Sequence, residues 1–182
     1  MAPIVVASAG SAALGVARAA DAPAVCGPTA RVTFREGAPV DRYLIENLSP
    51  GDWAIARLEI ALAGSAGRLV FDTVGGGPGR NVAQPFVVRS GEGDAALAAM
   101  PDIPDGAEAM VLAFERFMPG QVFRFTIDMD DRLAGWGTTV DGPEIEGAAV
   151  TVRFVDAGGA AVEVFASFDG QAVARPTMPC VS

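Results

Sequence analysis

The stretch VFRFTIDMDD (residues 122–131) decides the fold class. Its apolar side chains fall on every second position, at Phe123, Phe125, Ile127 and Met129. The intervening positions are polar and carry Arg124, Thr126, Asp128 and Asp130. A two-residue period of this kind is typical of a β-strand with one face in a hydrophobic core and the other toward solvent.

Short runs of the same kind recur along the chain and are separated by turn residues such as SPGD, PGQ and DAGG. The runs are RVTF (31–34), RYLIENL (42–48), WAIARLEIAL (53–62), RLVFDT (68–73), NVAQPFVV (81–88), EAMVLAFERF (108–117), AAVTVRFV (148–155), AVEVFASF (161–168) and QAVAR (171–175). No segment of helical length shows a 3.6-residue period. We therefore expect an all-β fold, an antiparallel β-sandwich of jelly-roll-like kind with about nine strands in two sheets.

Two of these runs predict local irregularities. In WAIARLEIAL, Trp53 and Ile55 have the opposite parity to Leu58 and the apolar residues after it, which indicates a β-bulge near Arg57. Pro85 interrupts the run 81–88, and a proline that cannot donate a ladder hydrogen bond favours an edge strand or a bulge.

Composition narrows the function classes. The chain has 182 residues, 51% of them hydrophobic, and this fits one domain with a sizeable core. The formal net charge is −9, which argues against binding to nucleic acid or anionic lipid. There is no His, and all 13 basic residues are Arg, so His-based catalysis, imidazole ligation and lysine Schiff bases are excluded. We expect no catalytic residues and no enzyme activity.

The N-terminal residues 1–22 resemble a signal peptide. Residues 2–17 are apolar or small and uncharged, and the following ARAADA offers small residues for cleavage after Ala19, Ala20 or Ala22. No Arg or Lys precedes the apolar run, so a small-residue N-terminal tail is the alternative. The mature chain, residues 23–182, is then expected to form a single β-sandwich domain in the periplasm or outside the cell.

Two cysteines lie near the ends of the expected mature chain, Cys26 and Cys180. Two cysteines in an exported protein usually pair, so we expect a disulfide that ties the first strand to the last. Two separate buried thiols are the alternative.

Acidic residues at the end of VFRFTIDMDD form a candidate cation site. Asp128, Asp130 and Asp131 lie at a strand-to-loop junction, and Asp141, Glu144 and Glu146 follow in the next loop. Carboxylate oxygens are the ligands that Ca²⁺ prefers, although the spacing does not match an EF-hand loop. The alternative is a solvated strand end whose charge is offset by Arg132 or Arg124.

Three other patterns are weaker indications of a binding or catalytic site. The glycine-rich GRLVFDTVGGGPGRN (67–81) lacks the lysine and spacing of a phosphate loop and favours a hairpin turn, with Asp72 and Asn81 beside a minor polar pocket. Trp136 and Trp53 are candidate stacking residues for a sugar; for Trp136, in the loop LAGWG, the alternative is a lid that packs over the core. Paired carboxylates would also suit a glycoside hydrolase, but the chain has few polar aromatic residues for a sugar-cleaving groove.

Several blocks together resemble exported bacterial proteins of the aggregation factor core type. They are YLIENLSPGDWAIARLEIAL, AGSAGRLVFDTVGGG, NVAQPFVV, FTIDMDD and EIEGAAVTVRF. The resemblance covers most of the chain after residue 40 and implies a secreted, surface-associated β-protein with an adhesion or matrix role. Within these blocks it points to Asp128, Asp130 and Asp131 as site candidates.

Together these patterns predict an exported interaction module of adhesion type, with Ca²⁺ as the one candidate cofactor. Its expected partners are a surface polysaccharide or another envelope or matrix protein. Nucleic acid and membrane insertion of the mature chain are not expected. The alternatives are a carbohydrate-binding module and a carboxylate-dependent glycoside hydrolase.

Overall fold

The computed structural model describes residues 26–38, 40–77, 82–133 and 140–180. The predicted signal peptide, residues 1–22, lies outside the described residues. Within the described part, no helix has the length and apolar character needed to cross a membrane. The helical structure found there is one 3₁₀ turn, η1 (Gly142–Ile145).

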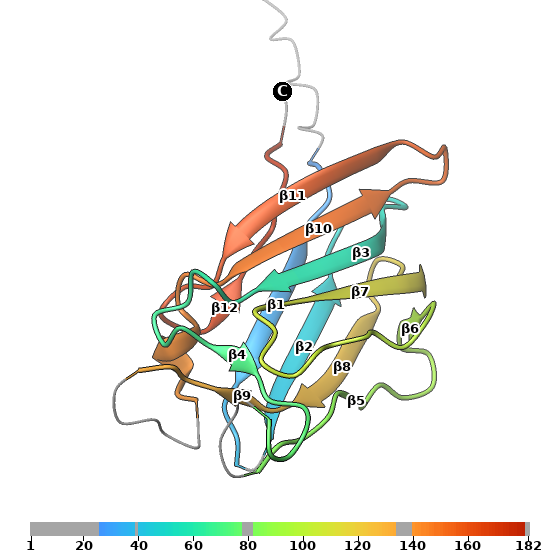
Figure 1. The fold of residues 1–182 in the computed structure, drawn as a ribbon. Helices are drawn as coiled ribbons and strands as arrows, with labels where there is room; N and C mark the ends of the chain where they lie inside the picture. The colour runs from blue at the N-terminus through green and yellow to red at the C-terminus, as the bar shows by residue number, and fades with distance from the viewer. Residues whose placement is uncertain (1–25, 39, 78–81, 134–139, 181–182) are drawn as a thin grey trace, which may run out of the picture.

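Two five-stranded antiparallel sheets pack against each other, as Figure 1 shows. The first sheet has the order β12 (Val173–Ala174), β1 (Ala30–Arg35), β2 (Asp41–Asn47), β8 (Val122–Ile127) and β5 (Val87–Val88). The second has the order β11 (Ala161–Ser167), β10 (Ala149–Val155), β3 (Ala54–Ala61), β7 (Ala109–Arg116) and β6 (Ala96–Leu97). The predicted all-β sandwich is confirmed.

A further short pair lies at one end of the sandwich, where β4 (Val70–Phe71) pairs with β9 (Met129–Asp130). The run 122–129 therefore contributes to two elements, because β8 ends at Ile127 and β9 begins at Met129. The two five-stranded sheets and this pair make twelve described strands, more than the nine expected, since two-residue strands leave almost no periodic signal in a sequence.

The core lies between the two sheets and is filled by alternate residues of their strands. Phe123, Phe125 and Ile127 of β8 are no more than 1% exposed, as their parity predicts. The ring of Tyr43 from β2 stacks on Phe125 at a centroid distance of 4.8 Å and an interplanar angle of 6°. Its hydroxyl lies 3.1 Å from the sulfur of Met129, which gives this buried polar group a partner.

Both predicted irregularities are confirmed. β3 pairs with β10 through Arg57 opposite Arg153 and Ile55 opposite Phe154, so Ala56 is the extra residue of a bulge. The bulge lets Ile55 and Leu58 both point into the core, where each is at most 1% exposed. Two residues beyond Pro85, β5 forms the edge of its sheet.

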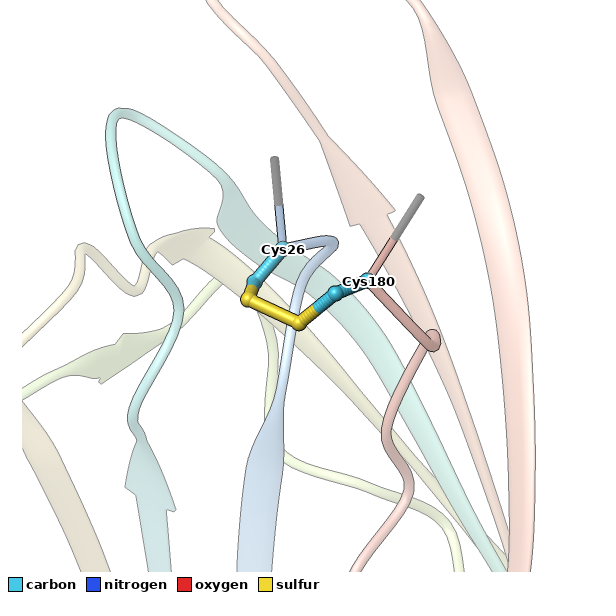
Figure 2. The surroundings of a disulfide bond; sticks show 2 residues. All are labelled: Cys26 and Cys180. Atoms are coloured by element: carbon cyan, nitrogen blue, oxygen red, sulfur yellow. A yellow bond between two sulfur atoms is a disulfide. The ribbon is translucent and has the colours of Figure 1, made fainter. Parts of the chain in front are cut away.

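The predicted disulfide between Cys26 and Cys180 is present and spans 154 residues of sequence (Figure 2). The backbone beside it already pairs, because Ala30 N–H donates to Pro176 O at 2.9 Å and Met178 N–H donates to Pro28 O at 3.0 Å. The disulfide therefore joins the segment before β1 to the segment after β12, next to the backbone hydrogen bonds that already hold these two segments together.

We expect the double variant Cys26→Ser, Cys180→Ser to be less stable by about 3–5 kcal/mol, because the unfolded chain regains the entropy of a long open loop. Urea titration of both proteins under oxidising conditions measures the difference. The two proteins should become equally stable when the parent is reduced. A persistent difference after reduction would show that the serines act through the native structure instead.

Candidate functional site

A buried group of carboxylates lies where β8 passes into β9. Asp128, Asp130 and Asp131 are 6%, 1% and 4% exposed. Asp72, which follows β4, is 2% exposed and belongs to the same group. The interpretation of Asp128–Asp131 as a solvated strand end is therefore wrong. The two arginines considered as its counterions pair elsewhere, Arg132 with Glu108 and Arg124 with Asp94, both at 2.8 Å.

The β4–β9 pairing assembles this acidic cluster, which we define as Asp72, Asp105, Asp128 and Asp130. Val70 lies opposite Asp130, and the N–H of Asp72 donates to the carbonyl of Asp128 at 3.0 Å. Asp105 enters from the segment before β7, where its Oδ1 accepts hydrogen bonds from the backbone N–H groups of Thr73 and Val74. Residues far apart in the sequence thus meet at one end of the sandwich.

Two oxygen atoms of the cluster are buried without a hydrogen-bond partner among the described residues, Oδ1 of Asp72 and Oδ2 of Asp105. A buried carboxylate oxygen without a partner carries a desolvation cost. Two acidic groups in contact can remove that cost by sharing a proton, or by sharing a cation.

Burial and mutual repulsion raise the pKa of three carboxyls in this region. Burial raises the pKa of Asp72 to about 6, assisted by the charge of Asp130 and by hydrogen bonding with Asp105. Burial also raises the pKa of Asp128 to about 7, assisted by the charges of Asp130 and Asp72. Asp41, on β2, has a pKa raised to about 8 by burial, and the charge of Asp128 adds to the shift.

The six residues predicted as calcium ligands fall into two parts of the structure. Asp128 and Asp130 belong to the acidic cluster, and Oδ1 of Asp131 accepts the N–H of Leu133 at 2.9 Å. The other three lie around η1: Glu144 Oε2 accepts the N–H of Asp141 at 2.7 Å and so caps the turn, and Glu146 ends it. Nowhere in the described ranges are three or more Asp, Glu, Cys or His residues placed to hold a metal ion.

The two tryptophans proposed for stacking have different outcomes. Trp53 is partly buried and packs against the core. Trp136 lies outside the described residues.

Sequence reasoning missed a groove on the outer face of the first sheet. It has a volume of about 470 Å³, and we call it the arginine groove. Its lining residues are Arg35, Val40, Arg42, Tyr43, Leu44, Arg89, Arg124, Phe125 and Thr126. The parity of β2 and β8 places Arg42 and Arg124 on the solvent face, but only the sheet order β1-β2-β8-β5 makes these arginines neighbours.

Comparison of the chain with models of known families, with curated proteins and with solved structures found no match. The function proposed below therefore rests on the sequence and on the geometry of this fold.

We expect stability to fall as the pH rises from about 4 to 8. Well below their ordinary pKa of 3.8, the carboxyls of Asp41, Asp72 and Asp128 are protonated in both states. Above it they ionise in the unfolded chain but keep their protons in the fold, where their pKa values are about 8, 6 and 7. The unfolded state is favoured increasingly until the pH exceeds these values.

The variant Asp72→Asn isolates this effect, because an amide needs no proton to remain neutral and can donate to Asp105 or Asp130. At pH 8 its melting temperature should exceed that of the parent by roughly 2–6 °C, and at pH 4 the two should agree. Calorimetry across this range measures both, with the exposed Asp102→Asn as the matched control. A constant difference at all pH values would contradict the titration of Asp72.

Proposed function

We propose that this chain is an exported interaction module that attaches to a surface polysaccharide or to another envelope or matrix protein, without catalysing a reaction. The observation that carries the proposal is the arginine groove, an open concavity on the outer face of a sheet. The face of a sheet supplies a rigid surface whose side chains project outward from fixed backbone positions.

Two further features support this proposal. A Cys26–Cys180 disulfide is compatible with an oxidising compartment, either the periplasm or the cell exterior. Asp72, Asp128 and Asp130 are the carboxylates closest to an acid–base arrangement, and at 1–6% exposure they are closed to a polymeric substrate. A binding role therefore fits the accessible chemistry better than a hydrolytic one.

The proposal predicts that the purified chain binds envelope or matrix material from the producing organism. Co-sedimentation with that material measures the bound fraction, and the double variant Arg42→Gln, Arg89→Gln should lower it about tenfold or more. The matched control is the double variant Arg57→Gln, Arg153→Gln, which removes two positive charges from the second sheet. No co-sedimentation of the parent chain with any envelope or matrix fraction would refute the proposed function.

We also propose that Ca²⁺ stabilises the module at the acidic cluster. Hard carboxylate oxygens suit this ion, and extracellular sites often bind it at millimolar concentration. Asp72, Asp105, Asp128 and Asp130 would contribute, and their side chains would have to rearrange to converge on the ion, because no three of the described carboxylates are placed to hold a metal in this structure. Bound Ca²⁺ would neutralise carboxylates that otherwise repel one another in a buried position.

Millimolar Ca²⁺ should raise the melting temperature at pH 8 and have a smaller effect at pH 5, where the cluster holds protons that compete with the ion. Scanning calorimetry in Ca²⁺, in Mg²⁺ and in chelator, at equal ionic strength, measures the shift. Asp72→Asn should reduce it, and Asp102→Asn should leave it intact. Equal shifts in Ca²⁺ and Mg²⁺, or no shift at all, would remove calcium from the proposal.

A further inference from the structure

The arginine groove is built from two pairs of opposed arginines. Arg35 of β1 lies directly opposite Arg42 of β2. Arg89 follows β5, and its N–H donates to the carbonyl of Arg124 at 2.8 Å, which continues the register of Val87 and Val88 along β8. Four guanidinium groups therefore project from four adjacent strands on one face.

Like charges placed opposite each other on a sheet are destabilising unless an opposite charge lies between them. Asp94 supplies one such charge, with its Oδ2 at 2.8 Å from Arg124 Nη1. Among the residues that the structure describes, no carboxylate lies within salt-bridge distance of Arg35, Arg42 or Arg89. The polar partner of Arg89 is Thr126, whose Oγ1 accepts Nε at 3.2 Å.

This arrangement is unusual because the chain as a whole is strongly acidic. It has 22 acidic and 13 basic residues, yet four of those 13 line one groove. Within the part of the chain that the structure describes, the acidic residue next to Arg35 does not pair with these arginines: Glu36 accepts the N–H of Gly142 at 2.7 Å instead. The surplus positive charge of the groove is thus available to an external anion.

The shape of the groove indicates what kind of anion fits. A volume of about 470 Å³ lies in the usual range for a small-molecule site. Neighbouring strands are about 4.8 Å apart, so the four arginines are distributed over about 14 Å from β1 to β5. A ligand that meets all of them is extended and carries several separated acidic groups, rather than one phosphate.

The floor between the arginines is partly apolar. Leu44 lies across from Arg124 in the ladder, and Val40 also lines the groove. Guanidinium groups bind carboxylate and sulfate through paired, charge-assisted hydrogen bonds, whereas aliphatic side chains suit the C–H faces of a sugar ring. Single-stranded nucleic acid would instead require exposed aromatic rings for base stacking, and Tyr43 and Phe125 are each only 1% exposed.

From this geometry we infer that the arginine groove binds a segment of an acidic polysaccharide, through carboxylate or sulfate groups held by Arg35, Arg42, Arg89 and Arg124. The inference rests on the proposed surface-attachment function and names its ligand class. It assigns the contact to the outer face of β1, β2, β8 and β5.

The test is calorimetric titration of the purified chain with oligogalacturonate and with sulfated dextran oligomers. The matched neutral probes are methyl-esterified oligogalacturonate and unmodified dextran. Both acidic probes, or one of them, should bind at least tenfold more tightly than its neutral counterpart, and the binding should weaken as salt is added.

Single arginine variants test whether the acidic probe binds in the arginine groove. Arg42→Gln and Arg89→Gln should each weaken binding about tenfold, whereas Arg153→Gln on the second sheet should change it less than twofold. Arg42→Gln should keep or raise the melting temperature, since it removes a charge opposite Arg35. If Arg153→Gln weakens binding as much as the groove variants do, the loss comes from the lower net charge of the protein alone, and the inference is overturned.

The remaining outcomes separate this inference from the proposed function. If envelope material still binds but neither acidic probe does, the module function stands and the ligand class is wrong. If neither acidic probes nor envelope material bind, both fail. Tighter binding to a single-stranded DNA oligomer or to anionic lipid vesicles, with the same dependence on Arg42 and Arg89, would overturn the assignment to a polysaccharide.

Discussion

The change in burial along residues 122–131 is the constraint on which the rest of the structure depends. At its start, this segment buries Phe123 and exposes Arg124 in the alternation of a two-faced strand. From Phe125 to Asp131 every residue is buried; Thr126 is contacted by Arg89, and the backbone of Asp128 is hydrogen-bonded to Gln84 and Asp72. One segment thereby supplies core aromatic rings to the sandwich, arginine to its outer face, and carboxylates to the end where β4 pairs with β9.

The sequence predicted those parts of the fold that depend on neighbours along the chain. The alternation in β8, the bulge beside Arg57 and the edge position after Pro85 all follow from local side-chain pattern and backbone chemistry. The disulfide was predicted because the chain has two cysteines and two cysteines in an exported protein usually pair. These features need no knowledge of which strands meet in space.

The two candidate sites were less predictable because they depend on contacts between distant segments. Asp72 was singled out only weakly, and Asp105 not at all, although both join Asp128 and Asp130 in the structure. Parity alone placed Asp128 on the solvent face, but its side chain is 6% exposed because the distant segments around Asp72 and Gln84 hydrogen-bond to its backbone. The arginine groove required the sheet order, in which β2 and β8 are adjacent despite being separated by more than 70 residues of sequence.

The disulfide also determines how this molecule would carry mechanical load. The bridge joins Cys26 to Cys180, and all the strands that the structure describes lie within the 154-residue loop between them (Figure 1). A pulling force applied through the chain beyond the two cysteines would pass along the covalent sulfur–sulfur bond and bypass the hydrogen-bonded ladders. In its oxidised form the sandwich would therefore remain folded under tension between its two ends, and reduction would transfer that tension to the pairing of β1 with β12.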